Sequence, residues 1–574
     1  MKKPFEISVQ SRITIVLLFF FAVLAVLIGR LFILQVVQNR EYTKLAARQH
    51  RLIKEILPER GIIYVQEKNA NLIPLAMNKV QKNITVSPQN IKDERFVASL
   101  LAKEFGVKEK DLLLKLADKS DLYEVLIKNA DSEKAKQVEE RRLDGLFLEE
   151  EKRRVYPHGS IASHLLGFVS KEAEEEEGRY GLERYYEAAL SGNKGFFEGA
   201  KDNAGFWVAL GRRIVRPPKN GSNLVLTIDY NIQSKTEVVL EGVMHKWQAV
   251  SGTILVTEPK TGRILAMASR PVFDPNNFSK ERNLSVFLNP LVESMYELGS
   301  VLKPVTMAGG LEEKLVTPDS TYEDPGSVKF GSYTVRNFDG KSYKTQTMTQ
   351  VLEKSLNTGA VYVARLLGKE RQLEYLKRFG FGEKTAVDLP GEITGDLSNL
   401  SGGKDIDFAT ASFGQGIAVT PMQLAMAIGV IANGGNLMKP HVVERVIDDS
   451  GNESKKNPEI KRNVLSKETA EKLTQMLVSA VKSGFENRAG VKGYFVAGKT
   501  GTAQVPRRDA RGYSDKVIHT FVGYAPAFNP RFLVLLQLNE PKGNRFAANT
   551  LTPAFHDVAE FILNYYEIPP DEVN

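Results

Sequence analysis

Cysteine is absent from the 574 residues, and histidine is scarce, with seven copies. Without cysteine the chain can form no disulfide, no thiolate zinc site and no Cys-ligated iron–sulfur cluster, and it has no thiol nucleophile. The histidines form no H-E-x-x-H pattern, and no G-x-S-x-G sequence occurs. Any chemistry is therefore left to serine, threonine, lysine, carboxylates or isolated histidines.

A strong charge of one sign is also missing. Lys+Arg number 77 and Asp+Glu number 69, which gives a formal net charge of +8. There is no basic stripe interleaved with aromatic residues, which argues against nucleic acid as a partner. The small basic surplus suits a solvated surface, or attraction to an anionic membrane or cell wall. The charged fraction of 25% excludes a fibrous or wholly disordered chain.

One long apolar run lies near the N-terminus. Residues 13–29 carry no charge, and apolar residues continue past Arg30 to Val37. A helix rises about 1.5 Å per residue, so this run approaches the thickness of a bilayer core. No small-x-small cleavage site follows, which favours an uncleaved anchor over 13–37 rather than a signal peptide or a buried core helix. Long domains after an anchor are translocated largely regardless of charge, so we expect 1–12 in the cytoplasm and the rest outside.

Turn residues at 216–222 predict a domain boundary near residue 220. Before it lies a domain over 38–220, in which residues from about 54 onward alternate short strand-like runs with charged helical stretches. Its acidic run 171–177 is expected to be a solvated loop or helix face. After it, 221–574 predicts an α+β domain with a largely antiparallel sheet flanked by helices. The elements expected there are strands at 223–228, 252–257, 263–269, 520–525 and 532–538 and helices at 232–247 and 554–566.

Three short motifs follow one another in the second domain. They are Ser300-Val-Leu-Lys303, Ser355-Leu-Asn357 and Lys499-Thr500-Gly501-Thr502. Each is weak alone, because S-x-x-K also occurs at 191–194, 401–404 and 479–482, and a second K-T-G occupies 260–262. The 260–262 copy is explained by a hairpin turn. The residues around each copy must therefore show which copies belong to an active site.

The surroundings of Ser300 favour it as a nucleophile. Pro304 is tolerated only near a helix start, which puts Ser300 at or near a helix N-terminus. Residues i and i+3 share a helix face, so the Lys303 amine is brought toward the Ser300 hydroxyl. A serine needs a base, and a lysine can serve when burial or a neighbouring cation lowers its pKa. The copies at 191 and 401 lie in Gly/Asn loops, where this geometry is not fixed.

The segment around Lys499 predicts a strand in which Gly501 permits close backbone approach by a ligand. A cation with two hydroxyls can hold a carboxylate there. The segment also matches the phosphate-binding expression G-x-x-x-x-G-K-T. The intervening Tyr-Phe-Val-Ala prefers a strand, however, and Pro506 leaves no room for the helix that a phosphate site needs. Nucleotide binding is therefore disfavoured, and His519 is expected to be structural.

The ordered set S-x-x-K, S-x-N and K-T-G is typical of penicillin-recognising serine acyltransferases. In its wider context the chain resembles the class B penicillin-binding proteins, the membrane-anchored monofunctional peptidoglycan D,D-transpeptidases. Further segments that carry the resemblance are 60–64, 154–159, 180–183, 258–267 and 413–416. Segments 355–359 and 413–421 are most similar to the FtsI-type cell-division branch. The chain departs from the family's pattern in two places, and neither contains a reacting group. The family commonly has a proline where Leu298 precedes Gly299 and where Glu59 precedes Arg60-Gly61.

The resemblance implies a transpeptidase domain after a β-rich, non-catalytic pedestal of the dimerisation type, and it implies roles for single residues. Ser300 would attack the penultimate D-Ala carbonyl of a stem peptide while Lys303 takes its proton. The implied catalytic residues are Ser300, Lys303, Ser355, Asn357 and Lys499. Thr500, Gly501 and Thr502, together with Lys499, would bind the substrate carboxylate. The backbone N–H groups of Ser300 and Thr502 would form the oxyanion hole.

The resemblance implies no metal and no cofactor. Its expected partners are stem peptides, β-lactam antibiotics, the membrane and, through the anchor and pedestal, an FtsW-like SEDS glycosyltransferase and divisome proteins. Three alternatives stay open. They are an elongation-type transpeptidase, a D,D-carboxypeptidase or β-lactam-hydrolysing relative that passes the acyl group to water, and a non-enzymatic divisome scaffold or β-lactam sensor.

Overall fold

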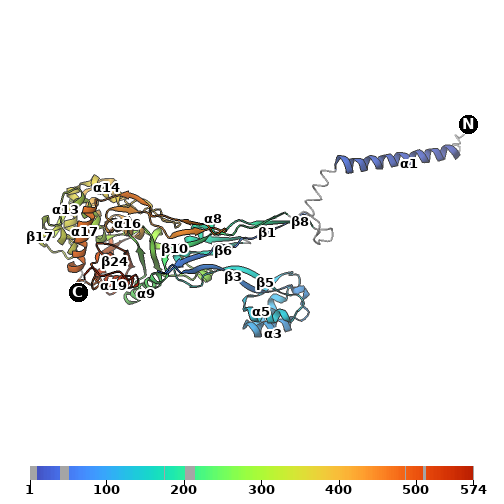
Figure 1. Ribbon diagram of the computed structural model, residues 1–574, viewed down its shortest axis with the longest axis horizontal. Helices are drawn as coiled ribbons and strands as arrows, with labels where there is room; N and C mark the ends of the chain where they lie inside the picture. The colour runs from blue at the N-terminus through green and yellow to red at the C-terminus, as the bar shows by residue number, and fades with distance from the viewer. Residues whose placement is uncertain are drawn as a thin grey trace. The chain divides into compact units, whose positions relative to one another are not determined.

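The computed structural model (Figure 1) describes residues 9–38, 51–172, 175–200, 214–484, 486–507 and 512–572. They fall into two compact units. One comprises Met1–Glu59 with Gly192–Asn220, and the other Arg60–Ser191 with Gly221–Asn574.

The first unit holds the apolar helix and a small sheet. α1 (Val9–Phe32) continues into a π-helical turn, η1 (Ile33–Val37). The stretch Ile13–Val37 is long and apolar enough to cross a bilayer, and its side chains are exposed on all faces, as a lipid-facing helix requires. The expected apolar helix over 13–37 is therefore present. The sheet is antiparallel and consists, in spatial order, of β1 (Arg51–Ile56), β8 (Gly195–Ala200) and β9 (Ile214–Arg216).

The N-terminal part of the second unit is β-rich and carries a small helical lobe. Apolar side chains of its longest strand, such as Ile84 and Val86, pack against three helices. The first of these helices starts after Asp93, whose side chain accepts the Phe96 N–H, and it ends at Gly106 with φ of 67°. The elements are β2 (Ile63–Gln66), β3 (Leu72–Val86), α3 (Glu94–Phe105), α4 (Glu109–Leu116), β4 (Glu124–Ala130), α5 (Ser132–Glu140) and β5 (Leu146–Val155).

A hairpin and three short helices follow this lobe. They are α6 (Ser163–Leu166), β6 (Phe168–Glu172), β7 (Glu175–Arg179), α7 (Gly181–Tyr185) and α8 (Glu187–Leu190). The acidic run 171–177 falls on the hairpin β6–β7, so the expectation of a loop or helix face is wrong, apart from 173 and 174, which lie outside the described residues. The strand β6 forms here because Phe168, its first residue, anchors it to the core. The Phe168 ring stacks on Phe278 with centroids 4.1 Å apart.

Two buried arginines join the start of this unit to α7. The Arg60 and Arg154 Nε atoms each donate to Glu183 at 2.7 Å, and the Glu183 side chain is fully buried. A buried carboxylate is tolerated when charged and hydrogen-bonded partners surround it. Burial opposes ionisation of Glu183, but the two guanidinium groups outweigh it and lower the pKa of the carboxyl. The segments 60–64, 154–159 and 180–183 therefore meet at one point.

The C-terminal part of the second unit is built on a five-stranded antiparallel sheet, in the order β12-β11-β25-β24-β23. Both faces are covered, which is why β11, β12 and β25 are buried along nearly their whole length. Leu533 and Leu535 point to the larger core cluster, whereas Val534 and Leu536 point to the cluster under α9 and α19. The elements are β10 (Asn223–Asp229), α9 (Tyr230–Trp247), β11 (Ser251–Thr257), β12 (Ile264–Arg270), β23 (Ala497–Pro506), β24 (Tyr513–Ala525), β25 (Phe532–Asn539) and α19 (Thr552–Tyr565).

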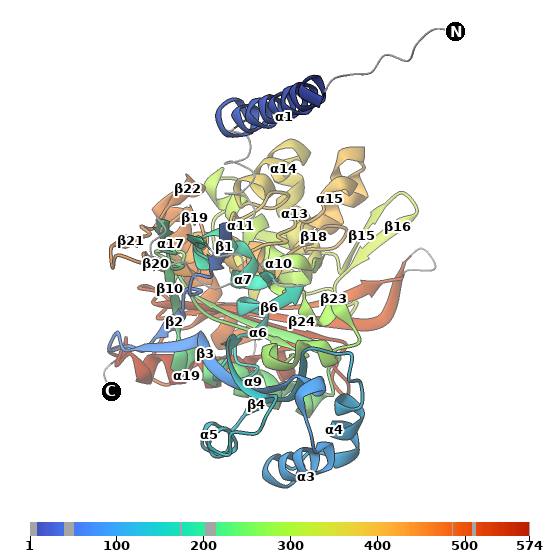
Figure 2. The same cartoon turned by 90° about the vertical axis from the view of Figure 1, so that its right-hand side faces the viewer.

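α9 and α19 cover one face of the five-stranded sheet, and most of the remaining helices cover the opposite face. Figure 2 shows α9 and α19 on one side of the strands and α11, α13 and α14 on the other. The covering helices are α10 (Pro290–Glu293), α11 (Lys303–Glu312), α12 (Met348–Glu353), α13 (Asn357–Leu367), α14 (Lys369–Arg378), α15 (Asp405–Ala411), α16 (Pro421–Ala432) and α17 (Lys467–Ser479). The short helix α18 (Ala547–Thr550) instead lies beside α19. The short strands are β13 (Tyr296–Glu297), β14 (Thr321–Asp324), β15 (Ser327–Phe330), β16 (Tyr333–Arg336), β17 (Lys344–Thr347), β18 (Ala418–Val419), β19 (Asn436–Met438), β20 (Val443–Ile447), β21 (Glu453–Lys455) and β22 (Ile460–Asn463). The predicted α+β class with an antiparallel sheet flanked by helices is confirmed.

Candidate active site

The candidate nucleophile lies in a tight turn at a helix start. Ser300 is the second residue of η5 (Gly299–Leu302), a 3-10 turn that leads into α11 at Lys303, with Pro304 in the first turn of the helix. Proline fits there because the first N–H groups of a helix have no partner within it. Gly299 has φ of 61°, and its N–H donates to the Gly414 carbonyl at 2.9 Å. The departure at Leu298 therefore leaves in place the glycine that this turn requires.

Lys303 is buried, with 1% of its surface exposed. Its Nζ donates to the carbonyl of Ser355 at 2.5 Å and to the Ser355 hydroxyl at 3.2 Å. Burial, with a contribution from the charge of Lys499, lowers the pKa of this amine well below its usual range. The i, i+3 spacing predicts only that the amine lies toward Ser300. In the structure the hydrogen bonds of this amine go to Ser355.

Lys499 approaches the same hydroxyl from β23. Its Nζ donates to Ser355 Oγ at 3.0 Å, and burial lowers the pKa of Lys499 to about 7. Ser355 lies between α12 and α13 with φ of 55°, a left-handed conformation that costs a non-glycine residue about 1–2 kcal/mol. The Ser355 hydroxyl thus joins two buried amines, one from the first motif and one from the third.

Two glycines bring β23 against the nucleophile turn. A Cβ atom on Gly501 would lie 2.8 Å from the Leu298 carbonyl oxygen and 3.3 Å from the Val301 nitrogen. A Cβ on Gly299 would lie 3.1 Å from the carbonyl oxygen of Thr502. A Cβ on Gly501 would be closer to the Leu298 oxygen than real Cβ atoms come, and a Cβ on Gly299 would be very tight, so the K-T-G strand and the Ser300 turn are in direct backbone contact. The glycine of the third motif serves this contact.

The remaining predicted site residues lie around this contact. Thr500 and Thr502 are half-buried on β23, and the Thr502 hydroxyl accepts the Ala547 N–H at 3.2 Å. Asn357 begins α13, and its Nδ2 donates to the Arg336 carbonyl at 2.8 Å. The structure therefore brings all three motifs together, with Lys303, Ser355 and Lys499 joined by hydrogen bonds.

This arrangement suits a serine activated by a lysine. A neutral amine can accept a proton, whereas a protonated amine cannot. Burial lowers the pKa of Lys303 well below its usual range and that of Lys499 to about 7, so Lys303 is the amine suited to act as the base. His519 does not compete for the role of base. It is fully buried opposite Thr502 in the β23–β24 register and contacts Thr550 Oγ1 at 2.9 Å and the Arg545 carbonyl at 3.2 Å. Burial lowers its pKa to about 4, which fits the expected structural role.

The rival motif copies are explained by local structure. Ser401 lies in a short 3-10 turn, η6 (Ser398–Gly402), which ends before Lys404, so no helix turn joins the serine and the lysine of this copy. Lys260 lies in the turn between β11 and β12, where Gly262 has φ of 77°. Lys499 is inside strand β23 with no helix starting at it, which removes the phosphate-loop alternative.

Gly414 was missed as a site residue by the sequence reasoning, which used 413–416 only as a mark of resemblance. A Cβ on Gly414 would lie 2.2 Å from the carbonyl oxygen of Gly299. This glycine therefore lets its loop support the nucleophile turn. The signal in the sequence was the pair of glycines at 414 and 416, but glycines alone do not reveal which backbone they approach.

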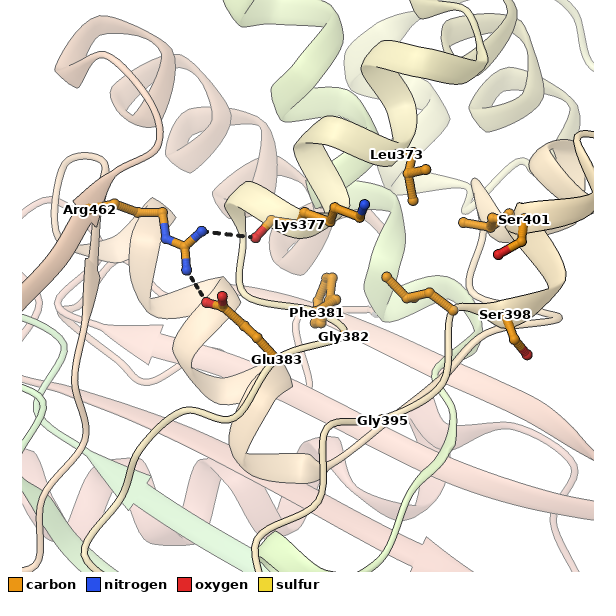
Figure 3. A pocket seen from close by; sticks show the side chains of 11 residues that line it. Leu373, Lys377, Phe381, Gly382, Glu383, Gly395, Ser398, Ser401 and Arg462 are labelled. Carbon is orange, nitrogen blue, oxygen red and sulfur yellow. Dashed lines mark hydrogen bonds and ion pairs between the residues drawn. The ribbon is translucent and has the colours of Figure 1, made fainter.

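A cavity lies away from this site. Its volume is about 460 Å³, and Figure 3 shows it beside α14, with Leu373 and Phe381 among its apolar lining residues. Arg462 is paired with Glu383 at its rim. None of the predicted site residues lines it. Among the described residues, no group of three or more His, Asp or Glu side chains could hold a metal ion.

Replacement of the buried Lys499 by methionine is expected to stabilise the fold. The unfolded chain holds a proton on Lys499 up to about pH 10.4, whereas the folded chain releases it near pH 7. The unfolded state binds more protons between these values, so the wild-type free energy of unfolding rises with pH there. Lys499→Met should raise that free energy by about 2 kcal/mol at neutral pH, and the gain should shrink toward pH 10.

Urea unfolding of the full chain in detergent at several pH values measures this gain. Lys492→Met is the matched control, because Lys492 is exposed just before β23 and should change little. A Lys499→Met chain less stable than wild type at neutral pH would contradict the prediction.

The fold and site are those of a serine-type acyltransferase that recognises penicillin. Residues 252–560 match the penicillin binding protein transpeptidase domain, and residues 55–226 match the penicillin-binding protein dimerisation domain. The chain belongs to the penicillin-binding protein transpeptidase family. It is a peptidoglycan D,D-transpeptidase of the FtsI and penicillin-binding protein group, so the predicted enzyme class is confirmed.

Relatives match nearly the whole chain. Stage V sporulation protein D of Bacillus subtilis is 33% identical over 560 residues, which are 96% of this chain and 84% of the relative. Peptidoglycan D,D-transpeptidase FtsI of Escherichia coli is 28% identical over 560 residues, 96% of this chain and 90% of the relative. The crystal structure of penicillin binding protein 3 from Mycobacterium tuberculosis complexed with aztreonam has a TM-score of 0.70 and 26% identity, covering 90% of this chain and 98% of that one.

Proposed function

We propose that the chain cross-links peptidoglycan through an acyl-enzyme on Ser300. Ser300 Oγ bonds to the penultimate D-Ala carbonyl carbon, and the bond from that carbon to the terminal D-Ala nitrogen breaks. Lys303 takes the serine proton, and the leaving amine receives a proton as it departs. The observation that carries the proposal is the hydrogen-bonded group of Lys303, Ser355 and Lys499 beside the Ser300 turn.

The third motif binds the end of the substrate. Lys499, Thr500 and Thr502 hold the terminal carboxylate, since a protonated amine and two hydroxyls form charge-assisted hydrogen bonds with it. Gly501 keeps the strand close enough to the serine. The backbone N–H groups of Ser300 and Thr502 stabilise the oxyanion. Ser355 and Asn357 relay the proton and position the substrate.

The second half-reaction passes the acyl group to an amine. The amine of a neighbouring stem peptide attacks the acyl-enzyme, the bond to Ser300 Oγ breaks, and the serine regains its proton. β-Lactams acylate Ser300 in the same way, but their ring opens without releasing a leaving group. A D,D-carboxypeptidase or β-lactam-hydrolysing enzyme would instead use water, so rapid release of label from penicillin-treated protein would remove transpeptidation as the leading reading.

Mass mapping after penicillin treatment tests the proposal. Full-length protein in detergent is incubated with penicillin, digested and analysed for the added mass. We expect one adduct, on the peptide that contains Ser300. An adduct on any other residue would overturn the site assignment. The peptide with the exposed Ser401, which belongs to another S-x-x-K copy, should stay unmodified in the same digest and serves as the internal control.

The proposed organisation follows the chain. Residues 1–12 are a cytoplasmic tail, 13–37 a single-pass anchor, 38–220 the pedestal and 221–574 the transpeptidase domain. The apolar helix Ile13–Val37 supports the anchor. The catalytic domain is outside the cytoplasmic membrane, and the anchor and pedestal dock an FtsW-like SEDS glycosyltransferase and divisome proteins.

Septal wall synthesis is the proposed cellular role, supported by similarity to proteins named FtsI. Similarity to Stage V sporulation protein D supports a second candidate, a transpeptidase used in sporulation. Depletion in growing cells separates them. Filamentation without septa favours division, whereas normal growth with defective spores favours the second role. If Ser300→Ala supports growth and cross-linking without binding penicillin, a scaffold role replaces both.

A further inference from the structure

The helix that carries Asn357 is capped from outside itself. α13 begins after Leu356, which has no polar side chain to accept the free N–H groups of the first turn. Asn337 accepts two of them, because its Oδ1 lies 3.0 Å from the Asn357 nitrogen and 3.3 Å from the Thr358 nitrogen. Asn337 follows β16 and is only 3% exposed. The cap of this helix therefore comes from the preceding hairpin.

Asp324 fixes the orientation of the Asn337 side chain. Asn337 Nδ2 donates to both Asp324 carboxylate oxygens, at 2.9 and 3.2 Å, which leaves Oδ1 facing the helix. Asp324 ends β14 and is 3% exposed. It also accepts from Thr358 Oγ1 at 2.6 Å and from the Tyr343 nitrogen at 2.8 Å. The pair is thus rigidly held and tied to the helix start from two directions.

The same segment also holds the second motif through its backbone. The carbonyl of Arg336, the residue before Asn337, accepts Asn357 Nδ2 at 2.8 Å. Ser355 is two residues upstream of Asn357 and adopts a left-handed conformation with φ of 55°. Its hydroxyl has to meet both Lys303 and Lys499. A residue in a strained conformation keeps its place only when its surroundings fix it.

We propose that Asp324 and Asn337 form a buried pair that positions Ser355 and Asn357 for the reaction. Neither residue touches the reacting atoms, so both are positioning residues. The inference rests on the proposed function, because the reaction that they serve is acylation of Ser300. A shift of about 1 Å in a catalytic group costs about a hundredfold in rate. Loss of the pair should therefore slow acylation by about 10- to 100-fold.

The Asn337→Ala variant is the first test. It leaves the two N–H groups of α13 without their acceptor, so Ser355 loses its fixed position. The quantity to measure is the first-order rate constant of acylation at saturating labelled penicillin, using full-length protein in detergent. This constant reports only folded molecules, because misfolded ones remain unlabelled and lower the amplitude instead. A loss of amplitude with an unchanged rate constant would overturn the proposal.

The Asn337→Asp variant tests the pair through the pH dependence of the acylation rate constant, which a purely structural role would not change. Two adjacent carboxyl groups at positions 324 and 337 repel when both are ionised, whereas one shared proton restores a donor between them. The ratio of wild-type to variant rate constants should therefore be large at pH 8 and fall toward unity as the pH falls. A ratio independent of pH would contradict the proposal.

Other titrating groups around the pair do not mimic this behaviour. Burial raises the pKa of Tyr322, which contacts Thr358, and a hydrogen bond to Asp339 raises that of Tyr343 to about 12. Burial opposes ionisation of Asp339, but the Tyr343 hydrogen bond outweighs it and lowers the pKa of Asp339. Lys354 lies over the Tyr343 ring. The first three keep one protonation state between about pH 5 and 9, and all four are also present in the wild type.

The exchanged variant Asp324→Asn with Asn337→Asp completes the test. It restores one amide and one carboxylate, with the carboxylate now accepting the N–H groups of the helix. Acylation should return to within about threefold of wild type, although each single substitution slows it by about 10-fold or more. Failure of the exchange to rescue the rate would overturn the pairing. Asn433→Ala is the matched control, because Asn433, which follows α16, hydrogen-bonds to the backbone of Pro259 and Asn436 and takes part in none of these contacts.

The experiment separates this inference from the proposed function. If wild-type protein is not acylated on Ser300, the proposed function fails and the pair has no reaction to serve. If the wild type is acylated there and all of the Asn337 variants react at its rate, only the positioning role fails.

Discussion

The Ser300→Ala variant is expected to form no acyl-enzyme with penicillin and no cross-links. The alanine side chain cannot bond to a carbonyl carbon, and Ser355, whose hydroxyl contacts both lysines, lies outside the nucleophile turn. Loss of a catalytic serine in a comparable hydrolase costs about a millionfold. Intact mass measured after incubation of full-length protein with penicillin should show the unmodified chain alone.

Ser401→Ala is the matched control for this experiment. It removes the serine of another S-x-x-K sequence from an exposed turn and should leave the adduct unchanged. Unfolding temperatures of both variants should stay near that of wild type, because a half-buried hydroxyl and an exposed one contribute little to stability. An adduct on the folded Ser300→Ala chain would show that another residue is the nucleophile.

The Lys303→Arg variant is expected to acylate about 10²–10⁴-fold more slowly than wild type, the range for removal of a general base. A guanidinium group stays protonated, so it cannot take the serine proton. The buried Lys303, in contrast, has a pKa well below its usual range, because of burial and the charge of Lys499. At neutral pH the wild-type amine is therefore ready to accept a proton.

The pH profile of acylation tests the roles of both lysines. The second-order rate constant should rise from acid pH as Lys303 loses its proton, and fall through about pH 7 as Lys499, which binds the carboxylate as a cation, loses its own. Because the Ser355 hydroxyl hydrogen-bonds to both amines, the two apparent pKa values of the profile belong to the coupled pair of lysines rather than to either one alone. Lys499→Arg keeps a cation at every pH, so its profile should lack the falling limb. A falling limb that persists in this variant would contradict the assignment of Lys499.

The sheet and its helices could be predicted because local and global signals agree. Strands such as 532–538 are apolar throughout and bounded by turn residues, which fits a sheet covered on both faces. The hairpins β14–β17 and β15–β16 could not be predicted, since their alternation is short and their polar residues are exposed. Their importance comes from Asp324 and Asn337, whose partners are up to 34 residues away.

The motifs located the candidate site but not its internal arrangement. Spacing within a helix brings Lys303 near the Ser300 turn, and this could be read from the sequence. The sequence does not reveal that the Lys303 amine hydrogen-bonds to Ser355 instead, because that contact spans 52 residues. The left-handed conformation of Ser355 is equally hidden, since serine has no preference for it.

The close packing of Gly299, Gly414 and Gly501 around the Ser300 turn limits how this chain can change. A methyl group on any of the three would meet backbone atoms at 2.2 to 3.1 Å. Gly414 lies against Gly299, and Gly501 lies against Leu298 and Val301 of the same turn, so a side chain at any of the three positions would press on backbone beside the serine. Selection under β-lactam drugs should therefore leave these three codons untouched.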